Sequence, residues 1–203
     1  MEVIKTTIRD VLIIEPKVFG DERGYFFESF NAKEFSEKTG LDVNFVQDNE
    51  SLSRYGVLRG LHFQLPPYTQ SKLVRVVKGR VLDVVVDIRK GSPTYGQYEM
   101  CELTEENHRQ FFVPKGMAHG FVVLSELAVF QYKCDDFYHP EAEGAIAWND
   151  ADVAIPWPIP SEDVILSEKD KHHPCLKDFD SPFSITDLHG EQLIESKTIV
   201  PNR

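Results

Sequence analysis

The feature that most constrains the fold is a series of short strand-like runs separated by glycine and proline. The runs lie at 3–8, 11–14, 24–30, 43–47, 57–63, 72–77, 81–88, 96–103, 111–113, 119–124 and 127–134. A spacing of about 8–12 residues, without regular strand–helix alternation, is typical of an antiparallel sandwich or barrel. The Lys78-Gly79 pair predicts a hairpin turn between two of these runs.

One short helix is expected between the early runs. Asn31 is suited to cap the first turn, and Glu34, three residues later, completes a capping box. The helix should end near Lys38, because Gly40 can adopt the left-handed conformation that follows a last turn.

The composition changes after about Asp150, where Pro156, Pro158 and Pro160 fall within five residues. Such a segment forms neither a helix nor a sheet ladder. A chain of 203 residues suits one domain with a full core. We therefore expect residues 1–185 to form a single domain with a Pro-rich C-terminal wrap, and 186–203 to be a C-terminal tail.

The net charge of −11 gives a field that repels nucleic acid and anionic membranes, so neither is an expected partner. No apolar run approaches the roughly 20 residues that cross a bilayer, and no signal peptide is visible. The three cysteines, Cys101, Cys134 and Cys175, form no disulfide framework and are expected to be reduced. A cytoplasmic location is the expectation.

His62 is the most informative candidate for chemistry. It lies in a strand-like run with Arg59, and Lys72 follows ten residues later. A neutral imidazole can accept a proton, and nearby cations can stabilise the charge left when a C–H bond ionises. Taken alone, His62 is better explained as a core histidine hydrogen-bonded to the backbone, and it is Lys72 that favours the functional interpretation. Arg59 and His62 should face opposite sides of a regular strand, unless a bulge at Gly60 turns both inward.

The Pro114–His119 segment, a PxGxxH pattern before an apolar run, resembles the second motif of the cupin superfamily. In metal-binding cupins the first motif supplies an HxH pair and a glutamate. Here the corresponding place reads His62-Phe63-Gln64, with no glutamate at the expected spacing. Because a stable site needs about three protein ligands, we expect no metal.

Four further segments carry candidate residues that are ordinary when taken singly. Tyr132 is either a core tyrosine or a proton donor opposite His62. Asp170 becomes functional if it contacts the second nitrogen of His62. The segments 23–28 and 47–49 offer a cation, aromatic rings and amides for an anionic ligand. His108, His172 and His173 are interpreted as surface residues.

Together these segments resemble the dTDP-4-dehydrorhamnose 3,5-epimerase family of the cupin superfamily, from residue 14 to about residue 182. The resemblance is carried by residues 21–24, 45–51, 58–64, 71–76, 112–121, 132–134 and 166–170. It implies an all-β fold, an antiparallel jelly-roll (cupin) barrel with a few short helices and the Pro-rich C-terminal wrap. It also implies a homodimer in which the segment holding Arg23 and Glu28 reaches the neighbour's pocket.

The resemblance also implies roles for individual residues. His62 would be the general base, paired with Asp170; Tyr132 would be the general acid; and Lys72 would stabilise the enolate oxygen. The positions implied to bind substrate are Arg23, Phe26, Glu28, Gln47, Asp48, Asn49, Arg59, Lys72, His119, Tyr138, Glu143 and Lys169. Of these, Phe26 and Tyr138 would pack on the base or the sugar.

The predicted activity is epimerisation at C3 and C5 of dTDP-4-dehydro-6-deoxy-D-glucose, for dTDP-L-rhamnose synthesis, without a cofactor. Both centres are α to the 4-keto group, so one cation can stabilise either enolate, and inversion needs a base and an acid on opposite faces. Three alternatives stay open at this point. They are a sister cupin that inverts one centre or isomerises a related dTDP-4-keto sugar, a non-catalytic nucleotide-sugar binding module, and a metal-dependent cupin oxygenase.

Overall fold

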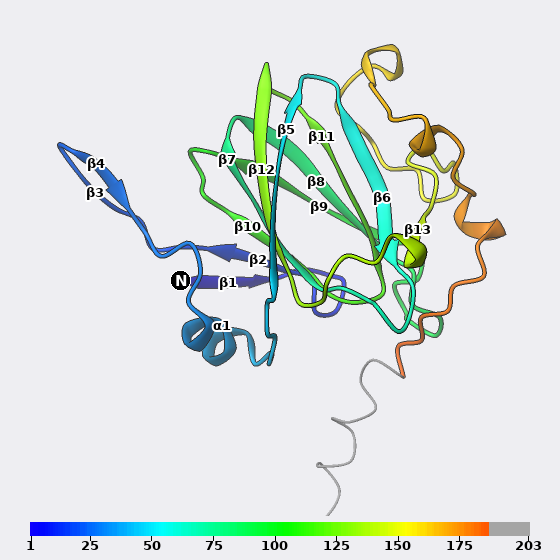
Figure 1. Ribbon diagram of the computed structural model, residues 1–203, viewed down its shortest axis with the longest axis horizontal. Coiled ribbons are helices and arrows are strands. Elements are labelled where there is room, and N and C mark those ends of the chain that lie inside the picture. The colour runs from blue at the N-terminus through cyan, green and yellow to red at the C-terminus, as the bar shows by residue number, and fades with distance from the viewer. Residues whose placement is uncertain (187–203) are drawn as a thin grey trace, which may run out of the picture.

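The computed structural model describes residues 1–186, in which two antiparallel sheets face each other as a flattened barrel (Figure 1). The first sheet has the strand order β1 (Glu2–Lys5), β2 (Leu12–Glu15), β10 (Gln110–Val113), β7 (Lys72–Lys78), β12 (Leu127–Cys134), β5 (Gln47–Arg54). The second has the order β13 (Glu143–Ala145), β6 (Leu58–Gln64), β11 (Met117–Val123), β8 (Arg80–Asp87), β9 (Tyr98–Thr104). This topology confirms the predicted all-β jelly-roll fold.

The predicted hairpin at Lys78-Gly79 is wrong, although a tight turn is present there. Gly79 has a φ of 80°, and β7 and β8 leave it into different sheets. β7 pairs with β10 and β12, whereas β8 pairs with β11 and β9. The turn therefore carries the chain from one sheet to the other, and it places β7 across the barrel from β6.

The apolar core fills one end of the space between the sheets. Its largest buried members are Phe111, Phe121 and Phe130, packed with valines from both sheets. The rings of Phe121 and Phe130 stack at 4.1 Å between centroids, joining β11 to β12 across the barrel. This packing sets the separation of the two sheets, and with it the width of the polar end.

The strand predicted at 43–47 is wrong, because the chain instead forms β5 from Gln47 onward. Val43 and Phe45 pack outside the barrel, against the cluster around Phe35. The inward positions of β5 are polar, with Gln47 and Asn49 among them, so the strand lacks the apolar alternation on which a sequence-based assignment depends.

A bulge in β6 turns Arg59 and His62 to the same side. Residues 119 and 121 of β11 pair with residues 62 and 59 of β6, so β6 holds one extra residue between the two pairs. Gly60 has a φ of 139°, and a Cβ added there would lie 2.6 Å from Gly120 Cα. The predicted bulge is therefore confirmed, and it requires glycine because the two strands approach so closely.

The helix α1 (Ala32–Thr39) is capped as predicted, by the Asn31 side chain and by Gly40 in the left-handed conformation. Glu34, however, accepts a hydrogen bond from the Met1 amino group, 2.5 Å away. Phe35 anchors the helix on the outer face of the first sheet. Ahead of α1, the β3–β4 hairpin (Phe19–Asp21 and Gly24–Phe26) projects away from the barrel (Figure 1).

The C-terminal segment wraps the outer face of the second sheet, as predicted (Figure 1). Ile146, Val153, Leu176 and Phe183 pack there on residues such as Leu61. The wrap contains the 3-10 turns η2 (Ser161–Asp163), η3 (Lys169–Lys171) and η4 (Leu176–Asp178), and η1 (Pro140–Ala142) precedes β13. Among the described residues, no helix is long and apolar enough to cross a membrane. The predicted tail, 186–203, lies outside the described residues except for residue 186, so the predicted domain division stays a prediction.

Replacing Gly60 with alanine should destabilise the barrel. The added methyl group meets Gly120 Cα, and overpacking of this kind costs about 1–3 kcal/mol, in addition to the strain of a positive φ. Chemical denaturation should measure the loss. The control is Gly20→Ala in β3, where the nearest atom is 3.7 Å from the new Cβ. Equal stabilities for the two variants would contradict the proposed close approach.

Candidate active site

A cavity of about 250 Å³ lies between the polar ends of the two sheets. Its walls are formed by Gln47, Asn49, His62, Phe63, Gln64, Gln70, Lys72, Tyr132, Tyr138 and Glu143. His62 comes from β6 in the second sheet, whereas Lys72 and Tyr132 come from β7 and β12 in the first. The candidate base and the candidate acid therefore line one cavity from opposite sides.

His62 is held by Asp170, which the C-terminal wrap carries in η3 to the edge of β6. His62 Nε2 lies 2.5 Å from Asp170 Oδ1. Asp170 is 4% exposed, while His62 keeps 25% of its side chain exposed. A carboxylate in this position orients the ring and fixes which nitrogen carries the proton.

Asp170 is itself fixed by its neighbours. The Ser167 hydroxyl donates to Asp170 Oδ2 at 2.8 Å, and His173 Nε2 lies 3.2 Å from Oδ1. Burial alone would raise the pKa of Asp170. The hydrogen bonds from His62 and Ser167 outweigh burial and hold the pKa at about 2, so the group is a carboxylate at neutral pH.

Tyr132 carries the phenol on the opposite wall. Burial, together with the nearby Cys134 thiol, raises the pKa of Tyr132 above its ordinary value. The phenol is therefore protonated at neutral pH. Lys72 Nζ lies 5.8 Å from the centre of the Tyr132 ring, so the candidate acid and the candidate cation are neighbours.

Lys72 interacts electrostatically with a second buried carboxylate, Asp83 of β8. Burial lowers the pKa of Lys72, against the opposing effects of Cys134 and Asp83. Asp83 is fully buried, which raises its pKa despite the adjacent His119. His119 Nε2 lies 2.9 Å from Asp83 Oδ1. The structure thus buries His119 in a contact with Asp83, and His119 is not among the residues that form the cavity walls.

Amides and Arg59 extend the polar lining along β5. The Gln47 amide donates to Asn49 Oδ1 at 3.0 Å, and the Arg59 guanidinium donates to Ser53 Oγ at 3.2 Å. Since Ser53 belongs to the opposite sheet, Arg59 points into the barrel on the same side as His62.

The rim of the cavity is formed by Tyr138 and by a Lys169–Glu143 ion pair. Lys169 Nζ lies 2.7 Å from Glu143 Oε2, and this hydrogen bond raises the pKa of Lys169. The Tyr138 backbone donates to Gln47 Oε1 at 3.0 Å, and its side chain stays 53% exposed. Tyr138 and Glu143 thus line the cavity directly, and Lys169 is joined to it through Glu143.

Four candidate residues are not brought to this cavity within one chain. Arg23 and Phe26 lie on the β3–β4 hairpin with 85% and 68% exposure, and Glu28 follows them on the surface. Asp48 pairs with Lys133 on the outer face of the first sheet.

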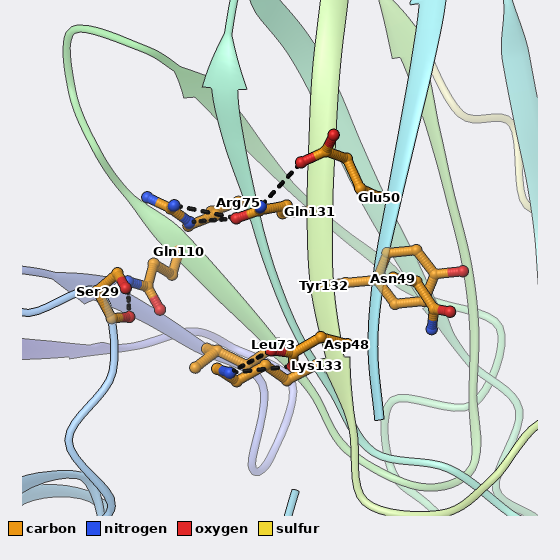
Figure 2. Close-up of a pocket in the computed structure, with 10 residues that line it drawn as sticks. All are labelled: Ser29, Asp48, Asn49, Glu50, Leu73, Arg75, Gln110, Gln131, Tyr132 and Lys133. Carbon is orange, nitrogen blue, oxygen red and sulfur yellow. Dashed lines mark hydrogen bonds and ion pairs between the residues drawn. The ribbon is translucent and has the colours of Figure 1, made fainter. Parts of the chain in front are cut away.

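Figure 2 shows Tyr132 and Asn49 directed to the opposite side of β12 from Arg75 and Gln131.

Several site residues escaped the sequence analysis. The interpretation of His173 as a surface residue is wrong, since it contacts Asp170, whereas His172 is exposed as expected. The three-residue spacing of Asp170 and His173 was an available signal. Gln64 lies two residues beyond His62 and so shares its face of the strand. Asp83 carried no local signal, because only the fold brings it to His119 and within the electrostatic influence of Lys72.

Comparison with known proteins agrees with this geometry. The family model described as dTDP-4-dehydrorhamnose 3,5-epimerase matches residues 5–178. The dTDP-4-dehydrorhamnose 3,5-epimerase of Shigella flexneri is 58% identical over 170 residues, which cover 84% of this chain and 93% of that relative.

Solved structures give the same result. The dTDP-6-deoxy-D-glucose-3,5-epimerase of Legionella pneumophila, in complex with dTDP-4-keto-L-rhamnose, is 54% identical with a TM-score of 0.85, covering 88% of this chain and 94% of that one. A 3'-monoepimerase from Streptomyces bikiniensis, in complex with dTDP-quinovose, is 31% identical with a TM-score of 0.85, covering 97% and 99%. The sequence, fold and cavity together show that this chain belongs to the dTDP-4-dehydrorhamnose 3,5-epimerase family.

Proposed function

We propose that the chain epimerises C3 and C5 of dTDP-4-dehydro-6-deoxy-D-glucose, giving dTDP-4-dehydro-L-rhamnose through enolate intermediates. The observation that carries the proposal is one cavity with a histidine–carboxylate pair on one wall and a buried phenol on the other. Inversion of a carbon centre needs removal of a proton from one face and delivery to the other. Two opposed proton-transfer groups meet that requirement.

His62 acts as the base through Nδ1. Because Asp170 is ionised, it accepts the proton of Nε2–H, which leaves the lone pair of the neutral ring on Nδ1. That nitrogen removes the proton α to the substrate ketone. The imidazolium that forms is stabilised by the adjacent carboxylate.

Lys72 stabilises the negative charge that moves onto the ketone oxygen. Its ammonium lies in a partly water-excluded wall, where a cation interacts more strongly with a developing oxyanion than it would in water. The two reacting carbons flank the same carbonyl. One lysine therefore serves both steps, and Tyr132 delivers a proton to the opposite face.

The diphosphate of the substrate is negatively charged and needs cationic side chains to bind it. Lys72 is the one lysine or arginine among the described residues that form the cavity walls. We propose that the protein is a homodimer in which the β3–β4 hairpin of one subunit places Arg23, Phe26 and Glu28 at the other subunit's cavity. The projection and exposure of this hairpin support that arrangement (Figure 1). Arg59 and Lys169 then complete the binding of the phosphates and sugar.

We place the reaction in the cytoplasm. All three cysteines are free thiols, with Cys101 and Cys134 buried, as suits a reducing compartment.

A single-centre epimerase is the second candidate, and the similarity to the Streptomyces bikiniensis 3'-monoepimerase favours keeping it. Product NMR after turnover in D2O separates the two activities. Inversion at both C3 and C5 supports the proposal, whereas one unchanged centre supports the single-centre activity.

His62→Asn should strongly slow solvent deuterium incorporation at both carbons, because the imidazole that Asp170 orients as the base is removed. A rate loss of about 10²–10⁴ is expected for removal of a positioned base. NMR of the recovered nucleotide sugar measures the exchange, and exposed His172→Asn is the control. Exchange retained in the His62 variant would reject the assignment of the base.

Tyr132→Phe should separate exchange from inversion. His62 still removes each proton and can return a deuteron to the same face, but no phenol delivers one to the opposite face. Deuterium should therefore accumulate in substrate of unchanged configuration faster than epimer appears, with Tyr98→Phe as the control. Equal loss of exchange and inversion would contradict the role of Tyr132 as acid.

If the β3–β4 hairpin of each subunit serves the cavity of the other, two inactive variants should complement each other. Arg23→Ala damages the hairpin, and His62→Asn damages the cavity. A mixed dimer regains one intact site, formed from the cavity of the Arg23 variant and the hairpin of the His62 variant. Co-refolding equal amounts should restore about a quarter of the wild-type sites, since half of randomly formed dimers are mixed. No recovery in demonstrated mixed dimers would show that each hairpin does not serve its neighbour.

A further inference from the structure

Three metal-binding side chains meet beside the cavity, and one of them, His173, transfers no proton in the proposed reaction. His62 Nε2 and His173 Nε2 lie 2.5 Å and 3.2 Å from the same oxygen, Asp170 Oδ1. All three potential ligand atoms lie within 4.8 Å of one another. The two rings are nearly perpendicular, with centroids 5.8 Å apart, so both direct a nitrogen at the carboxylate without stacking.

The chemistry of this cluster suits a divalent transition metal ion. Two imidazoles and a carboxylate are a ligand set that binds Zn²⁺. With metal–ligand bonds near 2.0–2.1 Å, ligand atoms in a tetrahedral site lie about 3.3 Å apart. The His173–Asp170 separation already matches this value. The His62–Asp170 separation would need to widen by about 0.8 Å once the metal replaces the shared hydrogen.

The cluster is open to solvent, and its carboxylate is held in position by a neighbouring hydrogen bond. His62 and His173 keep 25% and 19% of their side chains exposed, so an ion can reach them from solvent. Ser167 holds Asp170 Oδ2, which leaves Oδ1 directed at the two rings. Partners of this kind, which orient a ligand from behind, strengthen metal sites.

We propose that His62, Asp170 and His173 form a binding site for a divalent transition metal ion such as Zn²⁺, and that a bound ion inhibits the epimerase. This site differs from a cupin metal centre, which would join His62 to His119. In this barrel His119 is bonded instead to Asp83.

A metal ion bound to His62 would inhibit the reaction, because the two nitrogens of the imidazole share one proton and one available lone pair. A neutral imidazole has a lone pair on one nitrogen and a proton on the other. Catalysis uses the form with the proton on Nε2 and the lone pair on Nδ1. A metal bound to Nε2 needs a lone pair on that nitrogen, so the single proton of the neutral ring must lie on Nδ1. Nδ1 then has no lone pair, and the ring cannot accept the proton of the substrate. The inhibitory consequence rests on the proposed function, whereas the metal site rests on the geometry alone.

Binding can be tested without any measurement of activity. Co²⁺ serves as the probe because tetrahedral Co²⁺ absorbs visible light strongly, whereas Zn²⁺ is silent. Wild-type protein and His172→Asn should show this absorption at one ion per chain, and Zn²⁺ should displace it. His173→Asn and His173→Gln should lose it, while thermal melting without metal checks that both fold. Absent absorption in wild type, or equal binding by the His172 and His173 variants, would overturn the site.

Inhibition is tested by titrating Zn²⁺ into the deuterium-exchange reaction and comparing inhibited with uninhibited rates for each variant. His173→Asn should need at least about tenfold more Zn²⁺ for half inhibition than wild type or His172→Asn, and chelation by EDTA should restore the rate. Metal binding that leaves exchange unchanged would overturn the inhibitory role. Failure of the proposed function is recognised separately, because the His62→Asn experiment contains no metal.

Discussion

The polar end of this barrel depends on one constraint, which is that a buried carboxylate must lie against a cationic or proton-donating group. Asp170 contacts His62, and Asp83 contacts His119 and is also affected by the charge of Lys72. An unpaired charge in either place would cost several kcal/mol, and the cavity wall would not hold its shape. The same contacts that make burial possible also set the protonation states on which proton transfer depends, so stability and reactivity share one set of hydrogen bonds.

The division of the barrel into an apolar and a polar end explains how the site is positioned. Phe121 and Phe130 stack between the sheets at one end and fix their separation. At the other end the inward positions of β5, β6, β7 and β12 are polar, and their side chains face each other across a space of about 250 Å³. The bulge at Gly60 contributes Arg59 and His62 to this space from one strand. A regular strand would have sent one of them to the outer face.

Features determined by a few adjacent residues could be predicted from the sequence. Contacts between residues far apart in the sequence could not. The Asn31 cap, the Gly40 stop and the bulge at Gly60 each follow from the steric and hydrogen-bonding needs of a few adjacent residues. The position of β5 could not be predicted, because its inward face is polar and mimics a loop. The contact of Asp170 with His62 came from family resemblance, since 108 residues separate the two. Asp83 and His173 needed the assembled barrel, and Asp48 was misplaced by ignoring the alternation of side chains in its own strand.

The position of Asp170 in the C-terminal wrap has a consequence for the order in which the site is completed during translation. During translation His62 leaves the ribosome 108 residues ahead of its carboxylate, a delay of roughly 5–20 s at ordinary elongation rates. In that interval the remaining barrel strands are synthesised, but the imidazole does not yet have the carboxylate that orients it. A nascent chain therefore lacks an oriented base until the last part of the fold docks, so the reactivity of the site is completed only when η3 is in place.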